Sequence, residues 1–437
     1  MFKSGSRPRT NLMRSFFSRV SFALFVTAIL TQSGAAQNNP LTWQDVLARF
    51  ESNNPVLLAD QLNIDESKAE EITQYLRPNP SFTALEDGTQ LAPYQGVWRP
   101  LSGTEVQGSL SYLHERDHKR ELRLQAQQEN TKVTIDTHAD LERTLIFNLR
   151  SAFVGVLQAK AIYKLAEDDL AYYDKVLEIS RATFSAGGIA QIDMDRLDLQ
   201  RVQYESELET ADVNLRTAKI QLLTMLNDRT PIDKFDVTGT FNFQDNLQPL
   251  EEFRQIALDN RPDLKAAIES VTEAQVNYKL AVSNGSTDPT LSAWYTYNPS
   301  FNNPYDHQTL GASVSIPLRI FDRNQGEKKR TQLDITLHQR LQEAAEAQVF
   351  SDVDTGYATL KSTLNLLRPY KAKYLDLSTR VRDTVTFSYQ HGGASLLDFL
   401  NAEADYRSVQ INYLTLVGTY LTSAAQLNMA VGKEVIQ

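Results

Sequence analysis

Hydrophobic and polar residues follow two different periods along the chain. Long stretches are rich in Leu, Ala, Glu, Lys, Arg and Gln, the residues that favour helix most strongly. One of them, residues 118–183, contains a single glycine and no proline. At about 1.5 Å per residue it would form a rod roughly 100 Å long, too long for a compact globular domain. The pattern therefore predicts a mainly α protein built from very long helices.

Four shorter segments alternate between apolar and polar residues. They lie near residues 80–113 and 289–317, two in each region. Such alternation is typical of strands with one apolar face, either in a transmembrane β-barrel or in a half-buried sheet of a soluble domain. Four strands cannot close a barrel, and open sheet edges are not tolerated in lipid. If these strands span a membrane, several chains must share one barrel, and three chains of four strands would supply 12.

The same order of elements occurs twice. The segment around Asn54–Pro55 matches that around Arg261–Pro262, 207 positions later, and Phe184–Asp193 matches Tyr389–Asp398 at an offset of 205. Ordered matches at nearly one offset indicate a tandem duplication. Each repeat is expected to open with a helix of about 35 residues before its strand pair and its helical hairpin. The predicted organisation is a signal peptide at 1–36, a first repeat at 37–228, a linker at 229–249, a second repeat at 250–432 and a tail at 433–437. In the first repeat the strands lie near 80–113 and the helical hairpin at 117–228. In the second repeat the strands lie near 289–317 and the helical hairpin at 324–430.

Glycine and proline mark the expected reversals and bends. Gly187–Gly188 and Gly392–Gly393 interrupt the helical pattern, and glycine supplies the positive φ that a tight reversal between helices needs. We therefore expect the tips of the two hairpins there. The second hairpin also contains Pro369, which should kink its descending helix.

The N-terminus has the three parts of a secretory signal peptide. Residues 1–19 carry five basic residues and no acid, Val20–Leu30 is apolar, and Ser33–Ala36 is made of small residues. The apolar run is shorter than the roughly 20 residues that span a bilayer, although a short membrane anchor is the alternative. We expect an exported protein whose mature part has no transmembrane helix.

Composition narrows the function classes. The chain has 44 basic and 54 acidic residues, a net charge of −10, so nucleic acid is not an expected partner. It has no cysteine, which excludes disulfides, thiolate metal sites and acylation at cysteine. No catalytic motif, cofactor motif or metal motif is found. His114 and His118 are spaced for a metal pair, but a solvated surface pair is the preferred interpretation.

Residues 41–432 together resemble the TolC-like outer-membrane efflux factors. The most specific match is the segment from Tyr389 to Tyr406, whose tyrosine, glycine and Leu-Asp-x-Leu-x-Ala run are similar to the family's second hairpin tip. Ser315–Gly326 resembles the strand-to-helix junction of the branch that serves heavy-metal efflux pumps. The resemblance implies a homotrimer, with four β-strands per chain in a shared 12-stranded transmembrane β-barrel and a trimeric α-barrel projecting into the periplasm.

The resemblance also implies partners and a role. A periplasmic adaptor (membrane fusion) protein and an inner-membrane RND-type pump would deliver substrates to this exit duct, which sits in outer-membrane lipid and has no enzymatic activity. Heavy-metal cations are the cargo that the branch suggests. The alternative is a periplasmic coiled-coil protein that tethers envelope layers without channel activity. A tether needs no alternating strands, whereas a channel needs both pairs.

Acidic residues near the hairpin tips are the candidates for a periplasmic gate. Asp398 and Asn401 are three apart and share a helix face, at positions where the family places an inward aspartate and, in some relatives, a second one. Three copies of Asp398 would form a carboxylate ring that attracts cations and tunes conductance. Asp193 is the repeat equivalent of Asp398. The other interpretation is that these acids only favour the helix dipole.

The same resemblance gives two further expectations for the tips. Tyr389 is expected to bond across to a neighbouring hairpin and help hold the tip closed. The adaptor is expected to dock on the hairpin tips, although their apolar residues could instead only pack the coiled hairpins. The docking residues so predicted are Gly187, Gly188, Ile189, Gly392, Gly393 and Leu396.

Overall fold

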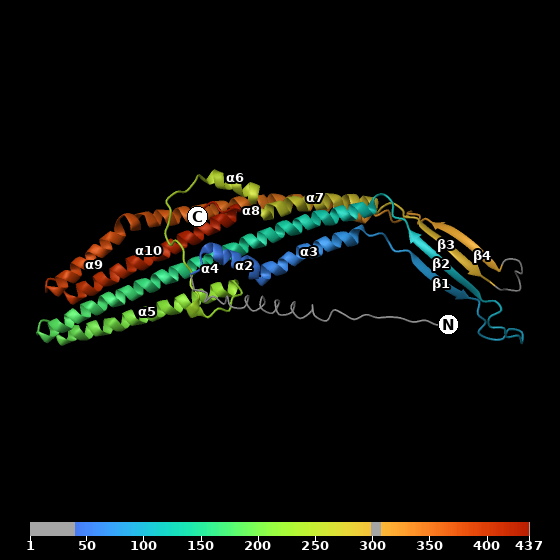
Figure 1. The fold of residues 1–437 in the computed structure, drawn as a ribbon. Coiled ribbons are helices and arrows are strands. Elements are labelled where there is room, and N and C mark those ends of the chain that lie inside the picture. Colours follow the sequence, from blue (N-terminus) through green and yellow to red (C-terminus); the bar gives the residue numbers. More distant parts are fainter. Residues whose placement is uncertain (1–39, 299–306, 437) are drawn as a thin grey trace, which may run out of the picture.

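The computed structural model describes residues 40–298 and 307–436. The predicted signal peptide and most of the loop between the last two strands lie outside these residues. The described chain is long and narrow, with a small sheet at one end and two helical hairpin tips at the other (Figure 1). The C-terminus lies between the two ends, where the helices of both halves run side by side.

The two halves follow the same order of elements, with one exception. The first half contains α2 (Trp43–Asn53), α3 (Pro55–Tyr75), β1 (Ser81–Asp87), β2 (Glu105–Leu113), α4 (Lys119–Ser185) and α5 (Gln191–Met225). The second contains α6 (Leu250–Asn260), α7 (Pro262–Ser283), β3 (Thr290–Tyr297), β4 (Gln308–Ser315), α8 (Gln325–Pro369), a π-helical turn (Tyr370–Tyr374), α9 (Leu375–Gln390) and α10 (Leu396–Val431). The exception is that α8, the π-helical turn and α9 stand in the second half where the first has the single helix α4. A short 3₁₀ turn, Ile232–Lys234, lies in the segment between the halves.

The opening helix of each half is broken, which corrects the expectation of one helix of about 35 residues. Pro55 and Pro262 each occupy the first turn of a new helix, where a missing N–H costs nothing. Asn54 also caps α3, because its side-chain oxygen accepts from the backbone N–H groups of Val56 and Leu57, each at 3.0 Å. The chain therefore changes direction at these two positions.

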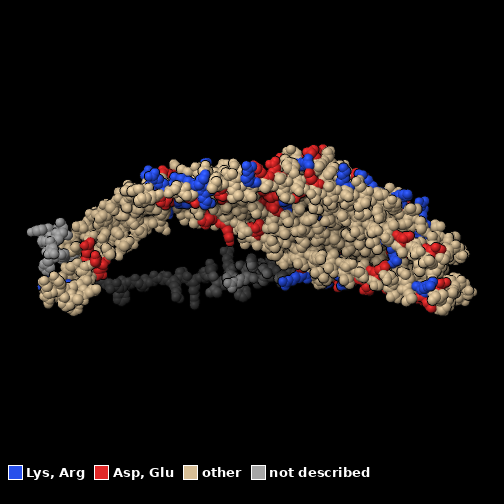
Figure 2. Space-filling view, turned by 180° about the vertical axis from the view of Figure 1, so that it is seen from behind, with Lys and Arg blue, Asp and Glu red and all other residues tan. Residues whose placement is uncertain are grey.

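The four strands form one antiparallel sheet in the order β1-β2-β3-β4. The register aligns the predicted apolar faces across all four strands: Phe82 pairs with Leu110, Leu110 with Ala293, and Ala293 with Ala312. This face is open to the surroundings, with Phe82 70% and Leu310 84% exposed. Within the described chain, β1 and β4 each have one unpaired edge. The strand prediction is confirmed, and the sheet end is mostly free of charge in Figure 2.

The opposite face of the sheet is mostly polar, and its larger apolar residues are Leu85, Leu113 and Trp294. The Trp294 indole lies over Gly311 of the neighbouring strand, where an added Cβ would come within 2.4 Å of the ring. A glycine is therefore required at Gly311 as long as Trp294 keeps this position. Serines from all four strands lie in one row on this face: Ser81, Ser111, Ser292 and Ser313.

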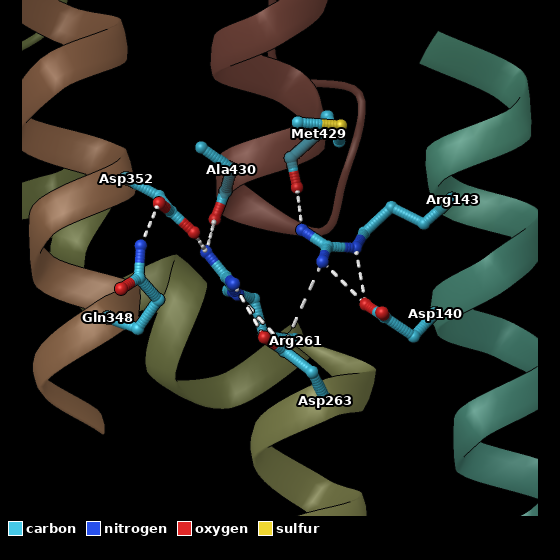
Figure 3. A network of polar contacts seen from close by, with 8 residues as sticks. All are labelled: Asp140, Arg143, Arg261, Asp263, Gln348, Asp352, Met429 and Ala430. Atoms are coloured by element: carbon cyan, nitrogen blue, oxygen red, sulfur yellow. Dashed lines mark hydrogen bonds and ion pairs between the residues drawn. The ribbon is translucent and has the colours of Figure 1, made fainter. Parts of the chain in front are cut away.

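A network of arginines joins the helices in the middle of the molecule (Figure 3). Arg261, whose side chain is 3% exposed, donates to Asp263 Oδ2 at 2.6 Å, to Asp352 Oδ2 at 2.8 Å and to the carbonyl of Ala430 at 3.2 Å. Arg143 of α4 donates to the carbonyl of Met429. Carbonyls at a helix C-terminus lack intrahelical partners, so these guanidinium groups complete the end of α10.

The equivalent position in the first half serves the same purpose with a different side chain. Asn54 Nδ2 donates to the carbonyl of Met225 at the end of α5, at 2.9 Å. Asn54 and Arg261 are 207 positions apart, and Met225 and Ala430 are 205 apart. The pair of helix-end contacts thus repeats at the offset seen in the sequence.

Pro369 ends α8, and the chain continues through the π-helical turn into α9. Proline removes one helical donor and clashes with the preceding turn, which is a common cause of a kink. In Figure 1, α9 departs from the direction of α8 and approaches the tip at an angle. The predicted kink is confirmed.

One helix bears on the expectation that the mature part has no transmembrane helix. Among the described residues, α4 alone contains an 18-residue window long and apolar enough to cross a membrane, by length and composition only. Only 28% of that window is buried in the chain. Because α4 runs along the whole helical part beside α5, α7 and α10, we interpret its apolar window as a surface for packing helices.

Candidate functional site: the hairpin tips and the layer above them

Both hairpins reverse through the same glycine turn. Gly187 and Gly392 adopt positive φ values of 82° and 74°, a region that residues with a Cβ rarely occupy. The following glycines close the turn, since Gly188 N–H donates to Thr183 O at 2.9 Å and Gly393 N–H to Ser388 O at 2.7 Å. These bonds satisfy carbonyls at the ends of α4 and α9. The predicted position of both tips is confirmed.

Asp398 lies at the start of α10 in a capping box with Ser395. Ser395 N–H and Oγ both donate to Asp398 Oδ2, at 3.1 and 2.7 Å, and Asp398 N–H donates back to Ser395 Oγ at 3.1 Å. The hydrogen bond from the Ser395 side chain is the main reason why the pKa of Asp398 lies below its usual value. The carboxylate is therefore ionised, exposed and fixed in direction, and Asn401 is exposed one turn further along.

Asp193 is in a different setting, although it is the third residue of its helix too. Ala190 occupies the N-cap of α5 and offers no side-chain hydrogen bond. Asp193 Oδ1 lies 3.8 Å from Arg196 Nη1, which is the local pair expected from the spacing. Asp195 accepts from Gln191 Nε2 at 2.8 Å on another face. The negative charge at the first tip is thus partly compensated.

Tyr389 lies between the hairpins of one chain. Its ring stacks on Phe399 with a centroid distance of 5.0 Å and an interplanar angle of 13°. Burial raises the pKa of the Tyr389 hydroxyl above its usual value. The ring packs on the core of the tip, whose buried members are Tyr173, Val176, Leu177, Met194, Leu197, Tyr204, Leu396 and Phe399.

The predicted docking surface requires one correction. Leu396 is only 8% exposed, because the first turn of α10 directs it into the tip core. Leu397 and Ile192 are instead 66% and 58% exposed. Ile189 is half-buried, and the four tip glycines are exposed. The apolar tip residues thus divide into a packing set and an outward set.

A group of charged residues above the tip core was not among the residues predicted from the sequence. Asp169 of α4 and Glu403 of α10 are only 8% and 4% exposed. Burial is the main cause that raises the pKa of Asp169 to about 6 and that of Glu403 to about 7. The signal in the sequence was spacing: Glu403 follows Leu396 and Phe399 at the seven- and four-residue spacing of one helix face, so an acid interrupts an apolar stripe.

Histidines do not gather into a metal site. Over residues 40–298 and 307–436, no group of three or more His, Asp or Glu residues is arranged to hold a metal ion. His118 is the left-handed residue that precedes α4, with φ of 56°. It lies 4.0 Å from Glu121, and its side chain is 87% exposed.

Comparisons with known proteins agree with this architecture. The family model described as "Outer membrane efflux protein" matches residues 253–433. The cobalt-zinc-cadmium resistance protein CzcC of Cupriavidus metallidurans is 22% identical over 408 residues, covering 90% of each chain. The outer membrane protein TolC of Escherichia coli is 24% identical over 307 residues, covering 64% of this chain and 60% of that one.

Solved structures have the same fold. CusC matches with a TM-score of 0.75 and 17% identity, over 89% of this chain and 92% of that one. The CmeC outer membrane channel of Campylobacter jejuni matches with a TM-score of 0.73 and 14% identity, over 90% and 87% of the chains. The open state of the MtrE outer membrane channel of Neisseria gonorrhoeae matches with a TM-score of 0.72 and 17% identity, over 90% and 89%.

The fold is therefore that of the outer-membrane efflux channels, with long helical hairpins and a small four-stranded sheet in each chain. The resemblance to TolC-like outer-membrane efflux factors is confirmed, since the second half matches the family model and CzcC aligns over most of the chain. TolC is described as an outer membrane protein, and CmeC and MtrE are described as outer membrane channels. Together they support an outer-membrane efflux channel.

Proposed function

We propose that the protein is the exit duct of a tripartite efflux system, passively conducting substrates across the periplasm and the outer membrane. One observation carries this proposal: a sheet with an exposed apolar face and two open edges lies at the opposite end of the molecule from the hairpin tips. A sheet of that kind suits lipid on its apolar side and water on its serine-rich side.

Closure of the barrel requires more than one chain. Open sheet edges in lipid leave backbone N–H and C=O groups without partners, so β4 of one chain must pair with β1 of the next. Three copies of the four-stranded sheet give a 12-stranded barrel and a homotrimer. The α-helical hairpins then project from the same three chains into the periplasm. We also propose the two halves, 37–228 and 250–432, as structural repeats joined by the linker at 229–249.

The tips would form the periplasmic gate and the docking surface. Three copies of Asp398 would give a ring of fixed negative charge, weaker than one with a second acid because Asn401 follows. The exposed glycines and Leu397 would receive a periplasmic adaptor, which connects the duct to an RND-type pump. Similarity to CzcC along 90% of both chains supports metal cations as the cargo.

Planar-bilayer recording with two matched lysine variants tests the channel. Leu310→Lys puts a charge on the apolar face, which costs about 2–4 kcal/mol at the bilayer midplane. It should abolish the heat-labile trimer and its conductance. Ser313→Lys, on the other face of the same strand, should assemble and change ion selectivity. If the wild-type trimer does not conduct, and if Leu310→Lys assembles as well as the wild type does, the result favours the periplasmic tether without channel activity.

The cargo is tested separately in cells. A host that lacks its own exit duct, but keeps a metal-exporting adaptor and RND-type pump, should regain tolerance to cobalt, zinc or cadmium when the protein is supplied. Tolerance to an organic toxicant in the same host is the control. Restored tolerance to the organic compound alone would contradict metal cargo and leave the channel proposal standing.

A further inference from the structure

The contact between the two hairpins contains a layer of polar and charged residues, which we call the interhairpin layer. All four helices at the tip contribute to it. Asp169 and Glu403, the two buried acids, come from different hairpins. The titratable and charged members are Asp168, Asp169, Tyr172 and Tyr173 of α4, Tyr204 and Glu207 of α5, Arg382 and Asp383 of α9, and Glu403, Tyr406 and Arg407 of α10.

The two arginines of the layer are engaged by other groups. Arg407 Nη1 donates to Glu207 Oε2 at 2.5 Å, and its guanidinium lies 4.3 Å from the centre of the Tyr204 ring. Arg382 donates to Asp383 Oδ1 at 2.9 Å. Its guanidinium also lies 4.5 Å and 3.9 Å from the ring centres of Tyr172 and Tyr406. These contacts hold both cations away from direct pairing with the buried acids.

Glu403 is connected to the facing hairpin by a short chain of hydroxyl groups. The Tyr172 hydroxyl donates to Thr386 Oγ1 at 3.2 Å, and Thr386 Oγ1 donates to Glu403 Oε1 at 3.4 Å. The chain links α4, α9 and α10. A carboxylate with one long hydrogen bond in a buried contact is poorly compensated, and a carboxylic acid is much better suited to that place.

Electrostatics sets the direction of the response to pH. Burial raises the pKa of Glu403 most, and the charge of Asp169 raises it further, while Arg382 and Arg407 oppose the shift. Burial is also the main cause of the raised pKa of Asp169, and the positive charges of Arg407 and Arg382 oppose that shift. Burial in the packed arrangement is the main cause of both raised pKa values, so separation of the hairpins would return them towards their usual range. Protonation therefore favours the packed arrangement, and that advantage is lost as the pH rises through about 6 and then about 7.

We propose that Asp169 and Glu403 form a proton-binding site between the hairpins, which holds them together when protonated and lets them separate when ionised. Ionised, the two carboxylates repel each other and draw water into the contact. Separation of the hairpins would widen the tip. The effect of the site on conduction rests on the proposed channel function, whereas hairpin separation does not.

Spin-label distances in the full-length protein test the proposal. The chain has no cysteine, so Leu199→Cys on α5 and Phe387→Cys on α9 give one defined label pair per chain at residues 71% and 62% exposed. Between about pH 5 and about pH 8, the separated population should rise at least about tenfold. The double variant Asp169→Asn/Glu403→Gln should keep its two hairpins packed together at every pH. Glu167→Gln removes an exposed acid of α4 that lies outside the layer and pairs with Lys164, and this variant should respond to pH as wild type does.

Single variants cover the case in which the double variant does not assemble. Glu403→Gln keeps the size of the side chain and an acceptor for Thr386, and should move the midpoint down towards that of Asp169 alone. A label distance that does not change with pH in wild type overturns the proposal, even if the channel conducts. An unchanged midpoint in Glu403→Gln, or a pH response that persists in the double variant, also overturns it. A midpoint that falls in Glu403→Gln, or a response that is lost in the double variant, supports the site even if conductance is absent.

Discussion

The two hairpin tips share one turn and differ in how the next helix begins. Both reverse through a left-handed glycine, yet the helix after the second turn begins with a Ser395–Asp398 capping box and the helix after the first begins at Ala190 without a side-chain cap. Ala190 and Ser395 are 205 positions apart, as are Asp193 and Asp398. The turn needs glycine for steric reasons, so both halves kept it. The cap contributes only stability and charge placement, so it could diverge.

The largest difference between the tips is expected in their packing. Met194 and Phe399 are the next equivalent pair, and Phe399 is fully buried while Met194 is 4% exposed. Phe399→Ala should destabilise the tip by about 3–5 kcal/mol, because it removes a ring that stacks on Tyr389 and Tyr173. Met194→Ala should cost about 2–3 kcal/mol, at the lower end of the range for such truncations. Hydrogen exchange of tip amides measures both, and equal costs would contradict the comparison.

An exchange of caps gives the next effect. Ser395→Ala removes the capping box and should weaken the start of α10 by about 1 kcal/mol. The reciprocal change Ala190→Ser should strengthen the start of α5 by a similar amount, since Asp193 already occupies the third helical position. Exchange rates of amides in the first turn of each helix report the change. If Ala190→Ser has no effect, the missing hydroxyl is not what distinguishes the tips.

The smallest stability effect, and the clearest effect on ions, is expected from the acids themselves. Asp398→Asn should reduce block by multivalent cations in bilayer recordings, and Asp193→Asn should do so less because Arg196 compensates its charge. The pKa of Asp398 is lowered by the Ser395 hydroxyl, so its stabilising contribution is present above the usual pKa of 3.8 and is lost only as the pH falls further. Equal effects of the two variants on block would place both acids, or neither, in the lumen.

Local chemistry made several features predictable. Gly187 and Gly392 had to be turns, because the helical pattern on both sides leaves the chain only a tight reversal with positive φ. Pro369 had to disturb its helix, and strict alternation had to place Phe82, Leu110 and Leu310 on one face. The break at Pro55 was also encoded, by an asparagine cap and a proline in the first turn, but the amphipathic period across it hid the boundary.

Other features depend on which helices meet. Glu403 and Asp169 each interrupt an apolar stripe, but only the packing of α10 against α4 buries them against the same contact and raises their pKa values. Leu396 and Leu397 are adjacent and equally apolar, and only the direction of the first turn of α10 decides that Leu396 packs inward while Leu397 is exposed.

Local sequence was enough to specify the elements: long rods, alternating strands, glycine turns, a proline kink and their recurrence at one offset. These arise from periods and backbone preferences that act within a few residues. The packing of the helices decides which charged residues are buried and whether Leu396 or Leu397 is exposed. It also brings Arg143 and Arg261 together at the end of α10. Such features require groups far apart in the sequence to share one place, and burial and Coulomb energy depend on that place alone.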